Sequence, residues 1–440
     1  MNKEEIIKAC GAKIIKDNIS GDFEISTDTR TIKSNDIYLP LKGANFDGED
    51  FIKNALDNGA IGYFTTKGIV YDSAKLVFQV DNTLETYLKL AEYYRDKIDP
   101  KVIAITGSSG KTTTKEMMFA VAKEKFNTIK TILNHNNEIG FCQTVFATNS
   151  DTQVLIIEMG MRGLGEIELI TKHAKPNIAI ITNTGSAHIG RLGSLENIAK
   201  AKCEITSYLN PKGTFIALNQ DIIKQTVKYN GEKIYYTIDD VIVLEKKPSY
   251  TKFIYKSQEY ELQVEGDYNI SNALGVIEAG YKLGLTYNEI KNGLYSYKPI
   301  EKRWEIENIN GFKIINDSYN ANPESMKASV KTFIELYENP VVILGDMGEL
   351  GENEKHFHKE IGIEFSKMKN VKFLTVGSLS EEISKELMSN GVSAKHFTNN
   401  EEVSRYILDN LNISNTIFLK ASRAMKFEEI IDNLKRGNIW

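Results

Sequence analysis

The sequence predicts an α/β fold of three domains: a small α/β N-terminal domain, a central P-loop domain on a mostly parallel sheet, and a C-terminal Rossmann-like α/β domain. Two observations favour it. Short apolar runs typical of buried strands alternate with helical patterns along the chain, as in parallel sheets covered on both faces. The chain also has 440 residues, enough for three domains of ~150 residues each. We place the domains at residues 1–82, 83–299 and 300–440.

The first block is typical of a small α/β module. We expect strands at 37–41, 61–65 and 76–80, and a helix near 51–58. The run 81–83 then caps a helix, because Asn and Thr precede an apolar stripe at helical spacing. Asp99-Pro100 ends this helix.

The second and third blocks repeat the α/β alternation. In the second we expect strands at 102–106, 154–158, 178–182 and 214–218, a hairpin near 252–264 and a helix over 269–283. In the third we expect strands at 312–316, 341–344, 372–376 and 416–420, with helices beginning near residues 323, 354, 380, 401 and 427. Pro323 suits the first position of its helix.

Composition excludes several classes of protein. The net charge is −5 without a basic block, so nothing favours binding to nucleic acid. No apolar run reaches ~18 residues, and the N-terminus does not resemble a signal peptide. The three cysteines form no C-x-x-C pair, which argues against a disulfide framework or zinc ribbon and suits a reducing compartment. We therefore expect a cytoplasmic protein without membrane insertion.

The most informative motif is a glycine turn between a strand and a helix. Its backbone N–H groups and the helix N-terminus suit phosphate oxygens, Lys111 can reach terminal phosphates, and Thr112 can hold Mg²⁺. The spacing is the short G-x-x-G-K-T-T form, since Ile105 stands where a standard P-loop has glycine, and it favours ligases that form an acyl phosphate. The candidate nucleotide-binding residues here are Gly107, Ser108, Ser109, Gly110, Lys111, Thr112 and Thr113.

Two further polar residues fall at the same edge of the predicted sheet. Glu158 ends one strand and His188 follows the next, and ligands bind at the carboxyl ends of parallel strands. With Thr112 they make a candidate Mg²⁺ site. The alternative is structural: Glu158 caps a helix and His188 bonds a backbone carbonyl.

Other candidates are weaker. Asn134 and Asn137 lie in an amide-rich turn that can bond sugar hydroxyls or phosphates. Asp317 and Tyr319 follow a strand end in the third block, where turn and cap roles are equally consistent with the pattern. Lys202 lies in a stretch whose local pattern favours a solvated helix face. A second polar strand end at 345–351 suggests that the third domain closes over the nucleotide.

Four segments resemble the Mur ligase family of ATP-dependent peptidoglycan-precursor ligases. They are Thr-Gly-Ser-Ser-Gly-Lys-Thr-Thr at 106–113, Asn-Thr-Gly-Ser-Ala-His at 183–188, Asn-Asp-Ser-Tyr-Asn-Ala-Asn-Pro at 316–323 and Leu-Gly-Asp-Met-Gly-Glu-Leu-Gly at 344–351. The resemblance covers essentially the whole chain. It is strongest to the branch that adds D-alanyl-D-alanine to UDP-N-acetylmuramoyl-tripeptide, and the Asp-Asn-Pro-Arg motif of a sister branch does not occur.

The resemblance implies roles for individual residues. Lys111, His188 and Lys202 would be catalytic, Lys202 as a carbamate that supports a second Mg²⁺, with Thr112, Glu158 and His188 as metal ligands. Nucleotide contacts would extend to Asn269, Arg303 and Asp317. Substrate contacts would come from Thr29, Arg30, Asp47, Asn134, Asn137, Tyr319 and Asn322.

The chain departs from the family pattern at four positions. Tyr268 replaces a usual His, Cys142 a Pro, Gly190 a Glu and Thr29 a Ser. None removes a phosphate or metal ligand. The resemblance therefore still implies the same reaction. ATP, bound with two Mg²⁺ ions, activates a carboxylate as an acyl phosphate, and an amine then attacks this intermediate. A monomeric enzyme would release ADP and phosphate.

Three alternatives stay open at this point. They are a relative such as folylpolyglutamate synthase, a non-catalytic nucleotide-binding protein, and an ordinary P-loop NTPase. The third peptide residue of the substrate, lysine or diaminopimelate, and the general base are also left open.

Overall fold

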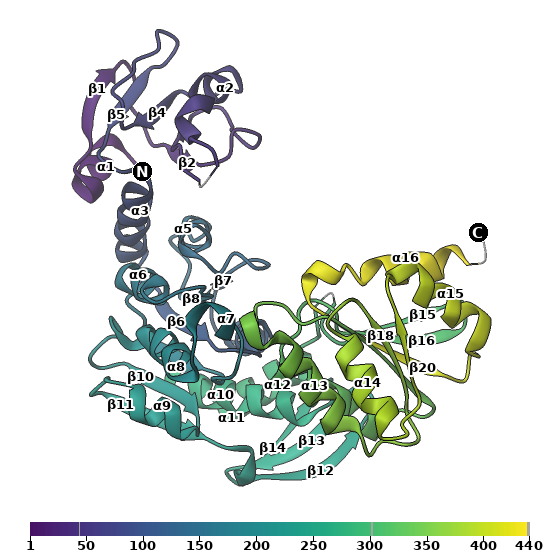
Figure 1. Ribbon diagram of the computed structural model, residues 1–440. Helices are drawn as coiled ribbons and strands as arrows, with labels where there is room; N and C mark the ends of the chain where they lie inside the picture. The colour runs from purple at the N-terminus through teal and green to yellow at the C-terminus, as the bar shows by residue number, and fades with distance from the viewer. Residues whose placement is uncertain (44, 301, 438–440) are drawn as a thin grey trace.

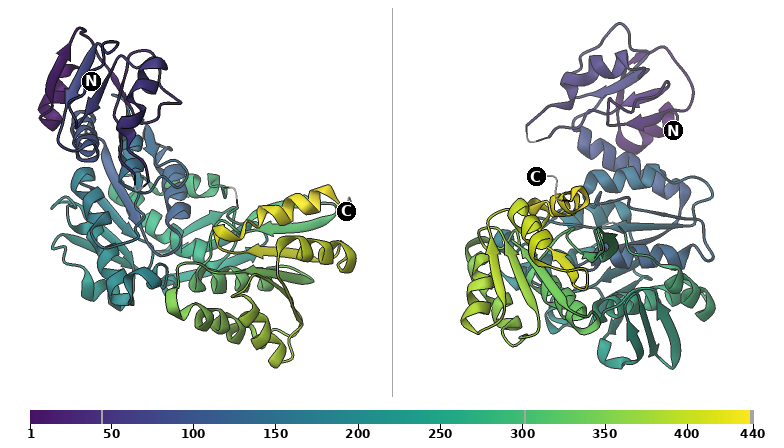
Figure 2. Two further views of the ribbon diagram at one scale, coloured as in Figure 1. Left: turned by 45° about the horizontal axis from the view of Figure 1, so that its top comes forward. Right: turned by 90° about the vertical axis from the view of Figure 1, so that its right-hand side faces the viewer.

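The computed structural model describes residues 1–43, 45–300 and 302–437. Its strands form four sheets. The fold is α/β with mostly parallel sheets in three domains, as predicted. Figure 1 shows the N-terminal domain joined through helix α3 to the central domain, with the C-terminal domain packed against the central one. In both views of Figure 2 the N-terminal domain stands apart from the C-terminal domain.

The first domain holds a five-stranded sheet of order β1-β5-β4-β3-β2. Only β1 runs antiparallel to its neighbour. Its elements are α1 (Lys3–Cys10), β1 (Lys13–Asp17), β2 (Glu24–Ser26), β3 (Asp36–Tyr38), α2 (Ile52–Asp57), β4 (Gly62–Thr65) and β5 (Leu76–Gln79). The sequence predicted β3, β4, β5 and α2 but not the partly exposed strands β1 and β2.

Helix α3 (Thr83–Ile98) joins the first domain to the second. Asn82 caps it by accepting a hydrogen bond from the Glu85 N–H, and it ends at Asp99 in the left-handed region. The predicted cap and stop are both confirmed. Buried Leu88 and Ala91 belong to a core shared with both domains, so the linker is packed on each side.

The central sheet is entirely parallel, in the order β11-β10-β9-β6-β8-β7. Its strands are β6 (Lys101–Thr106), β7 (Thr128–Lys130), β8 (Val154–Glu158), β9 (Ile178–Ile181), β10 (Thr214–Leu218) and β11 (Glu232–Tyr236). Its helices are α4 (Lys111–Ala122), α5 (Glu138–Phe146), α6 (Glu166–Ala174), α7 (Ile189–Leu192), α8 (Leu195–Cys203) and α9 (Asp221–Thr226). The edge strands β7 and β11 were not predicted.

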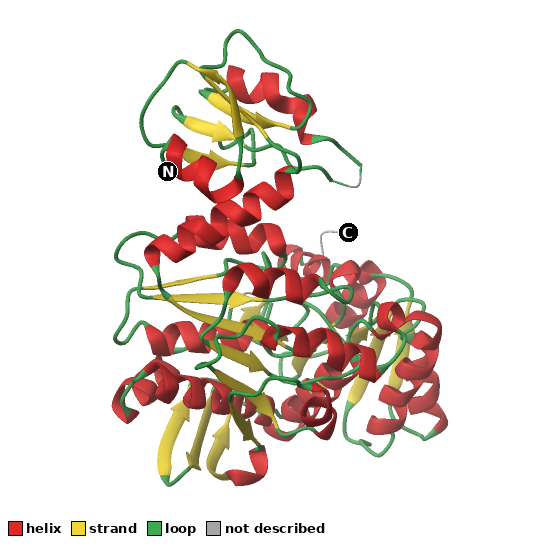
Figure 3. Ribbon diagram, turned by 90° about the vertical axis from the view of Figure 1, so that its left-hand side faces the viewer, coloured by secondary structure: helices red, strands yellow, loops and turns green. Residues whose placement is uncertain are grey.

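Both faces of this sheet are covered by helices, as Figure 3 shows. Along β6, Ile103 and Ile105 pack into one core cluster with Met117 of α4. Val102 and Ala104 pack into another, because successive side chains of a strand point to opposite faces. The sheet therefore fixes the direction of each strand end that carries the site.

A small antiparallel sheet and two helices complete this region. They are β12 (Val241–Lys247), β13 (Tyr250–Tyr255), β14 (Gln258–Leu262), α10 (Asp267–Leu283) and α11 (Tyr287–Ser296). The predicted hairpin is β13–β14, and β12 adds a third strand that the sequence did not reveal.

The C-terminal sheet has the order β15-β16-β20-β17-β18-β19 and is parallel except for β15. Its strands are β15 (Glu305–Ile309), β16 (Phe312–Asn316), β17 (Pro340–Gly345), β18 (Lys372–Val376), β19 (Ala394–Phe397) and β20 (Thr416–Lys420). Its helices are α12 (Pro323–Leu336), α13 (Glu354–Phe365), α14 (Glu381–Ser389), α15 (Asn400–Asn410) and α16 (Glu428–Arg436). Pro323 is the first residue of α12, as expected.

Among the described residues, every helix is too short or too polar to cross a membrane.

Candidate active site

A cavity of about 940 Å³ lies between the central and C-terminal domains. It opens at the carboxyl ends of β6, β8 and β16, where α/β sheets bind ligands. Most predicted site residues line it: Ser108, Ser109, Gly110, Lys111, Thr112, Thr113, Asn134, Asn137, Glu158, His188, Asn269, Arg303, Asp317, Tyr319 and Asn322. Gly107, Lys202, Thr29, Arg30 and Asp47 lie outside its lining.

The glycine turn has the backbone geometry that a phosphate cradle needs. Gly110 is the N-cap of α4 and adopts the left-handed conformation, with φ 79°. A side chain there would also clash, because a Cβ would lie 2.3 Å from Oδ1 of Asn272. No side chain caps the first N–H groups of α4, and residues 110–113 line the cavity. An uncapped helix N-terminus at a cavity is an arrangement that binds anions.

Lys111 is a partly buried cation at this turn. Its Nζ donates to the Gly107 carbonyl at 2.7 Å. Burial lowers the pKa of Lys111, the Glu158 carboxylate opposes this shift, and the Arg303 guanidinium adds to it. An anion bound in the cavity would stabilise the charged form of Lys111.

Glu158 lies at the end of β8 and is 2% exposed. Its Oε1 accepts hydrogen bonds from Thr112 Oγ1 at 3.2 Å and Asn136 Nδ2 at 3.1 Å. Its Oε2 lies 3.3 Å from Nζ of Lys115 but accepts no hydrogen bond from the described residues. Glu158 lines the cavity, and the donors to its carboxylate are side chains and not the N–H groups of a helix N-terminus. The alternative that it caps a helix is wrong.

His188 adopts a left-handed backbone conformation, with φ 67°. Its Nδ1 lies 2.6 Å from Oε2 of Glu349, a contact that lacks hydrogen-bond geometry. The nearby imidazole lowers the pKa of Glu349. The Gly190 N–H donates to the Glu349 carbonyl at 3.1 Å, so His188 faces a carboxylate of the C-terminal domain.

The donors present fit Mg²⁺. Glu158 Oε2 and His188 Nδ1 are buried atoms that accept no hydrogen bond within the described part of the chain. In the part of the chain that the structure describes, no group of three or more His, Cys, Asp or Glu side chains could hold a metal ion without further ligands. This suits Mg²⁺, which proteins commonly bind through one or two carboxylates plus substrate phosphates.

Lys202 is 1% exposed in α8, so the solvated-face interpretation of the local pattern is wrong. Ile198, one helical turn earlier, is also buried, and residues four apart share a helix face. Burial, reinforced by the charge of Lys111, lowers the pKa of Lys202 well below its ordinary value. A neutral amine is the form able to react with an electrophile.

The C-terminal domain contributes Arg303, Asp317 and Tyr319. Nη2 of Arg303 donates to Thr112 Oγ1 at 3.0 Å, and its guanidinium carbon lies 4.0 Å from the Tyr319 ring centre. Asp317 pairs with Lys420 at 2.6 Å and accepts from Ser329 at 2.9 Å. Lys420 was not predicted as a site residue. A lysine at the end of a buried strand is the sequence feature that could have indicated it.

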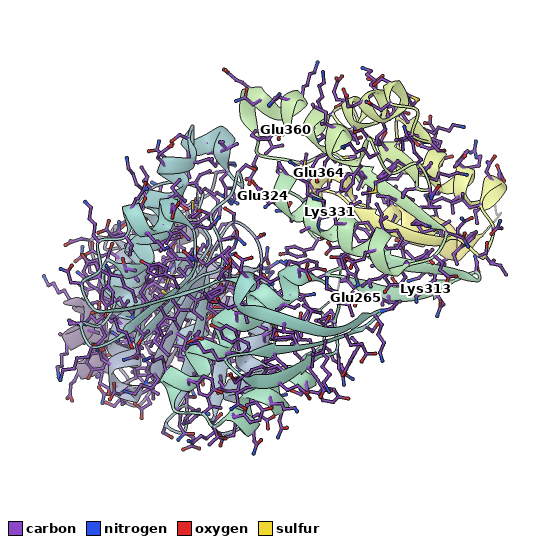
Figure 4. All side chains as sticks on the ribbon, turned by 90° about the horizontal axis from the view of Figure 1, so that it is seen from below. Glu265, Lys313, Glu324, Lys331, Glu360 and Glu364 are labelled. Atoms are coloured by element: carbon purple, nitrogen blue, oxygen red, sulfur yellow. The ribbon has the colours of Figure 1, made fainter. Side chains whose placement is uncertain are left out.

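The start of α12 also reaches the central domain. Asn322 caps this helix and donates through Nδ2 to the Ser108 carbonyl at 3.3 Å. Glu324 accepts hydrogen bonds from the backbone N–H and the hydroxyl of Ser186, at 2.8 and 3.0 Å. In Figure 4, Glu324 lies at the side of the C-terminal domain nearest the central one. Glu324 was not predicted, because its partner lies in another domain. Glu349 falls in the predicted polar strand end at 345–351, but its contact with His188 was not predicted.

Family models match all three domains. "Mur ligase family, catalytic domain" matches residues 24–87, "Mur ligase middle domain" residues 105–280, and "Mur ligase, glutamate ligase domain" residues 302–423. The chain belongs to the Mur ligase family.

Individual proteins resemble this Mur ligase in sequence or structure over almost its whole length. It is 35% identical to the UDP-N-acetylmuramoyl-tripeptide–D-alanyl-D-alanine ligase of Bacillus subtilis, over 93% of this chain and 92% of that one. A crystal structure of MurF from Acinetobacter baumannii matches with a TM-score of 0.91 at 25% identity, covering 98% of each chain. A MurF ligase from Thermotoga maritima in complex with ADP matches with a TM-score of 0.83 at 25% identity, over 94% of this chain and 97% of that one.

The N-terminal residues of this Mur ligase that were predicted to bind substrate lie together. Arg30 pairs with Asp28 at 2.7 Å, and Asp47 pairs with Lys67 at 2.9 Å. Burial and the charges of both Asp28 and Asp47 raise the pKa of Tyr38 to about 12. Thr29 follows Asp28, so both predicted segments carry an aspartate that acts on the same tyrosine. They lie in the domain at the top of Figure 1.

The amides of this Mur ligase have mixed roles. Asn137 caps α5 by accepting the Gly140 N–H at 3.0 Å, and Asn134 lines the cavity. Asn269 donates to the Glu265 carbonyl at 2.6 Å within the first turn of α10. Asn136, which the sequence analysis did not single out, is the amide that contacts Glu158.

Proposed function

We propose that this Mur ligase joins D-alanyl-D-alanine to UDP-N-acetylmuramoyl-tripeptide and cleaves ATP to ADP and phosphate. The observation that carries the proposal is the interdomain cavity, in which a phosphate cradle and a buried carboxylate from one domain face an arginine from another. The names of the relatives supply the substrates.

The nucleotide phosphates would bind at the glycine turn. Residues 107–113 offer N–H groups, and Lys111 can leave the Gly107 carbonyl for a phosphate oxygen. Arg303, already on Thr112, adds a second cation. Asp317 suits ribose hydroxyls, and Asn269, with Tyr268 beside it, suits the base. These cations offset the repulsion between the substrate carboxylate and ATP.

Thr112, Glu158 and His188 would hold Mg²⁺, which supplies charge neutralisation at the phosphates. Lys202 would carry a carbamate that supports a second ion. Its burial and lowered pKa favour the neutral amine that reacts with CO₂. The carbamate anion would also remove the repulsion between Lys202 and Lys111.

The reaction balances as two displacements. A terminal carboxylate oxygen of the tripeptide attacks the γ-phosphorus, the bond to the β–γ bridging oxygen breaks, and ADP leaves. The deprotonated amine of D-alanyl-D-alanine then attacks the acyl carbon, and phosphate departs with that carboxylate oxygen. Because the cavity lies between two domains, closure would exclude water from the acyl phosphate.

Each domain would have its own task. Residues 1–82 would hold the UDP moiety through Thr29, Arg30 and Asp47, and residues 83–299 would hold ATP. Residues 300–440 would close over ATP and bind the dipeptide, with Tyr319 and Asn322 at the cavity and Asn134 and Asn137 opposite. We propose that the enzyme acts as a monomer in the cytoplasm.

The test is product formation by purified protein with MgATP, D-alanyl-D-alanine and a tripeptide substrate ending in lysine or in diaminopimelate. We expect a product whose mass equals the condensation of the two substrates, with one phosphate released per product. Phosphate release with neither substrate would indicate an NTPase. Condensation with glutamate and a folate in place of both substrates would indicate a folylpolyglutamate synthase.

A further inference from the structure

Lys115 is a buried cation that the proposed reaction does not use. It lies in α4 one turn after Lys111, and its side chain is 0% exposed. A buried ammonium persists only where acceptors surround it. Its partners therefore indicate what it does.

Three groups surround the ammonium. Nζ lies 3.3 Å from Oε2 of Glu158 and 3.4 Å from Oε1 of Glu116, and it donates to the Leu133 carbonyl at 3.2 Å. Lys130 pairs with the other oxygen of Glu116. Two lysines and two glutamates thus balance in charge within this group, and removing Lys115 would make the surroundings of Glu158 more negative by one charge.

The Leu133 contact fixes the loop between β7 and α5. This loop carries Asn134 and Asn137, the residues proposed to contact substrate. It also carries Asn136, which donates to Glu158 and accepts a hydrogen bond from the Gly160 N–H at 2.7 Å. Leu133 itself is 70% exposed, so its side chain contributes little packing and its carbonyl contact holds the turn.

The same ammonium competes with a cation for Glu158. Oε1 already has two donors, Thr112 and Asn136, so Oε2 is the oxygen left for a metal, and it is the one that Lys115 approaches. A positive charge at this distance lowers the affinity of the carboxylate for a dication. Nucleotide phosphates would then be needed to retain the metal.

We propose that Lys115 is a positioning residue with two effects: its charge keeps Glu158 from binding a divalent cation until nucleotide is present, and its contact with Leu133 holds the loop that meets the muramyl substrate. The proposal rests on the proposed function for the identity of that substrate.

The test compares Lys115→Met, which removes the charge and the donor, with Lys115→Arg, which keeps the charge and alters the geometry. Mn²⁺ binding is measured by electron paramagnetic resonance without nucleotide, and UDP-N-acetylmuramoyl-tripeptide binding by calorimetry. For Lys115→Met we expect Mn²⁺ to bind at least threefold more tightly and the tripeptide at least threefold more weakly. For Lys115→Arg we expect unchanged Mn²⁺ binding and weakened tripeptide binding.

Affinity changes of opposite sign for Mn²⁺ and the tripeptide distinguish this role from simple structural damage, which would weaken the binding of both. Lys123→Met is the matched control, because Lys123 is an exposed lysine just after the same helix, and it should change neither affinity. Weaker or unchanged Mn²⁺ binding by Lys115→Met would overturn the charge effect. If that variant does not fold, unchanged tripeptide binding by Lys115→Arg would overturn the loop effect. Failure of the wild-type protein to form product would instead contradict the proposed function, since Mn²⁺ binding needs no turnover.

Discussion

At the scale of single residues, three lysines in or beside the cavity are removed from solvent wholly or in part. Lys115 and Lys202 are buried in the central domain, and Lys111 is partly buried there. Such groups resist burial unless an anion offsets their charge or they lose their proton. Lys115 has carboxylate partners, whereas burial and the neighbouring Lys111 lower the pKa of Lys202.

The carbamate proposed on Lys202 has a direct test. We expect Lys202→Ala to lose about 10²–10³-fold in kcat, comparable to removing one charge-stabilising group from an active site. A short-chain carboxylate such as acetate should restore part of the rate, because it can occupy the space with an anion. The rate of product formation is measured against carboxylate concentration. Lys200→Ala, at the neighbouring exposed lysine, is the control, and an absence of rescue would count against the carbamate.

The sequence could predict residues that carry their chemistry in a local motif, such as Lys111 and Thr112. It could not predict partners supplied by another domain. Glu324 lies two residues after a helix cap, where acidic residues are ordinary, and only the packing of α12 shows that it binds Ser186. The burial of Lys202 could have been predicted, because Lys202 lies four residues after the apolar Ile198 and so shares its helix face.

At the scale of helices and strands, the sequence predicted the buried strands better than the partly exposed ones. Strands such as β6, β8, β10 and β20 are buried along most of their length and were predicted within a residue or two. The missed strands all lie at sheet edges, and they are β1, β2, β7, β11, β12, β15 and β19. The side chains of such edge strands lack a continuous apolar pattern. The candidate site residues could be predicted because many of them lie at the ends of the buried strands.

The junction of α3 with α6 gives an element-scale prediction of pH dependence. Glu92 of α3 contacts His173 at 2.8 Å and also pairs with Lys175, and these partners lower its pKa to about 2, the hydrogen bond from His173 contributing most. A depressed carboxyl pKa stabilises the fold above the ordinary value of 4.5, and this stabilisation is lost as the pH falls toward about 2.

We therefore expect Glu92→Gln to lower the thermal midpoint at pH 7 by about 2 °C. The difference from wild type should shrink as the pH falls below 4.5. Thermal denaturation followed by circular dichroism at a series of pH values measures it. A difference that stays constant down to pH 3 would contradict the assignment to this carboxylate.

At the scale of the whole molecule, the central and C-terminal domains meet through a few polar contacts. They include Arg303 to Thr112, Asn322 to Ser108, Glu324 to Ser186, Glu349 to His188 and Tyr337 to Glu265. Gly190 and Gly351 also approach closely, since a Cβ on Gly190 would lie 2.4 Å from the Gly351 nitrogen. The departure from the family pattern at Gly190 thus leaves space for the neighbouring domain.

Removing one of these contacts should loosen the arrangement. We expect Glu324→Ala to increase the radius of gyration in small-angle X-ray scattering without ligands, because two hydrogen bonds to Ser186 are lost. A non-hydrolysable ATP analogue with Mg²⁺ should reduce the difference. Glu338→Ala, at an exposed residue just beyond the other end of α12, should scatter like wild type. Identical scattering by both variants would show that Glu324 does not hold the domains together.

The central claim is that the cavity between these domains transfers a phosphoryl group to a carboxylate and not to water. The most direct measurement uses UDP-N-acetylmuramoyl-tripeptide labelled with ¹⁸O in its terminal carboxylate, with MgATP and D-alanyl-D-alanine, and determines the mass of the released phosphate. The account predicts that each phosphate carries one oxygen from the labelled carboxylate. Phosphate without label would mean that water attacks the nucleotide, and would contradict it.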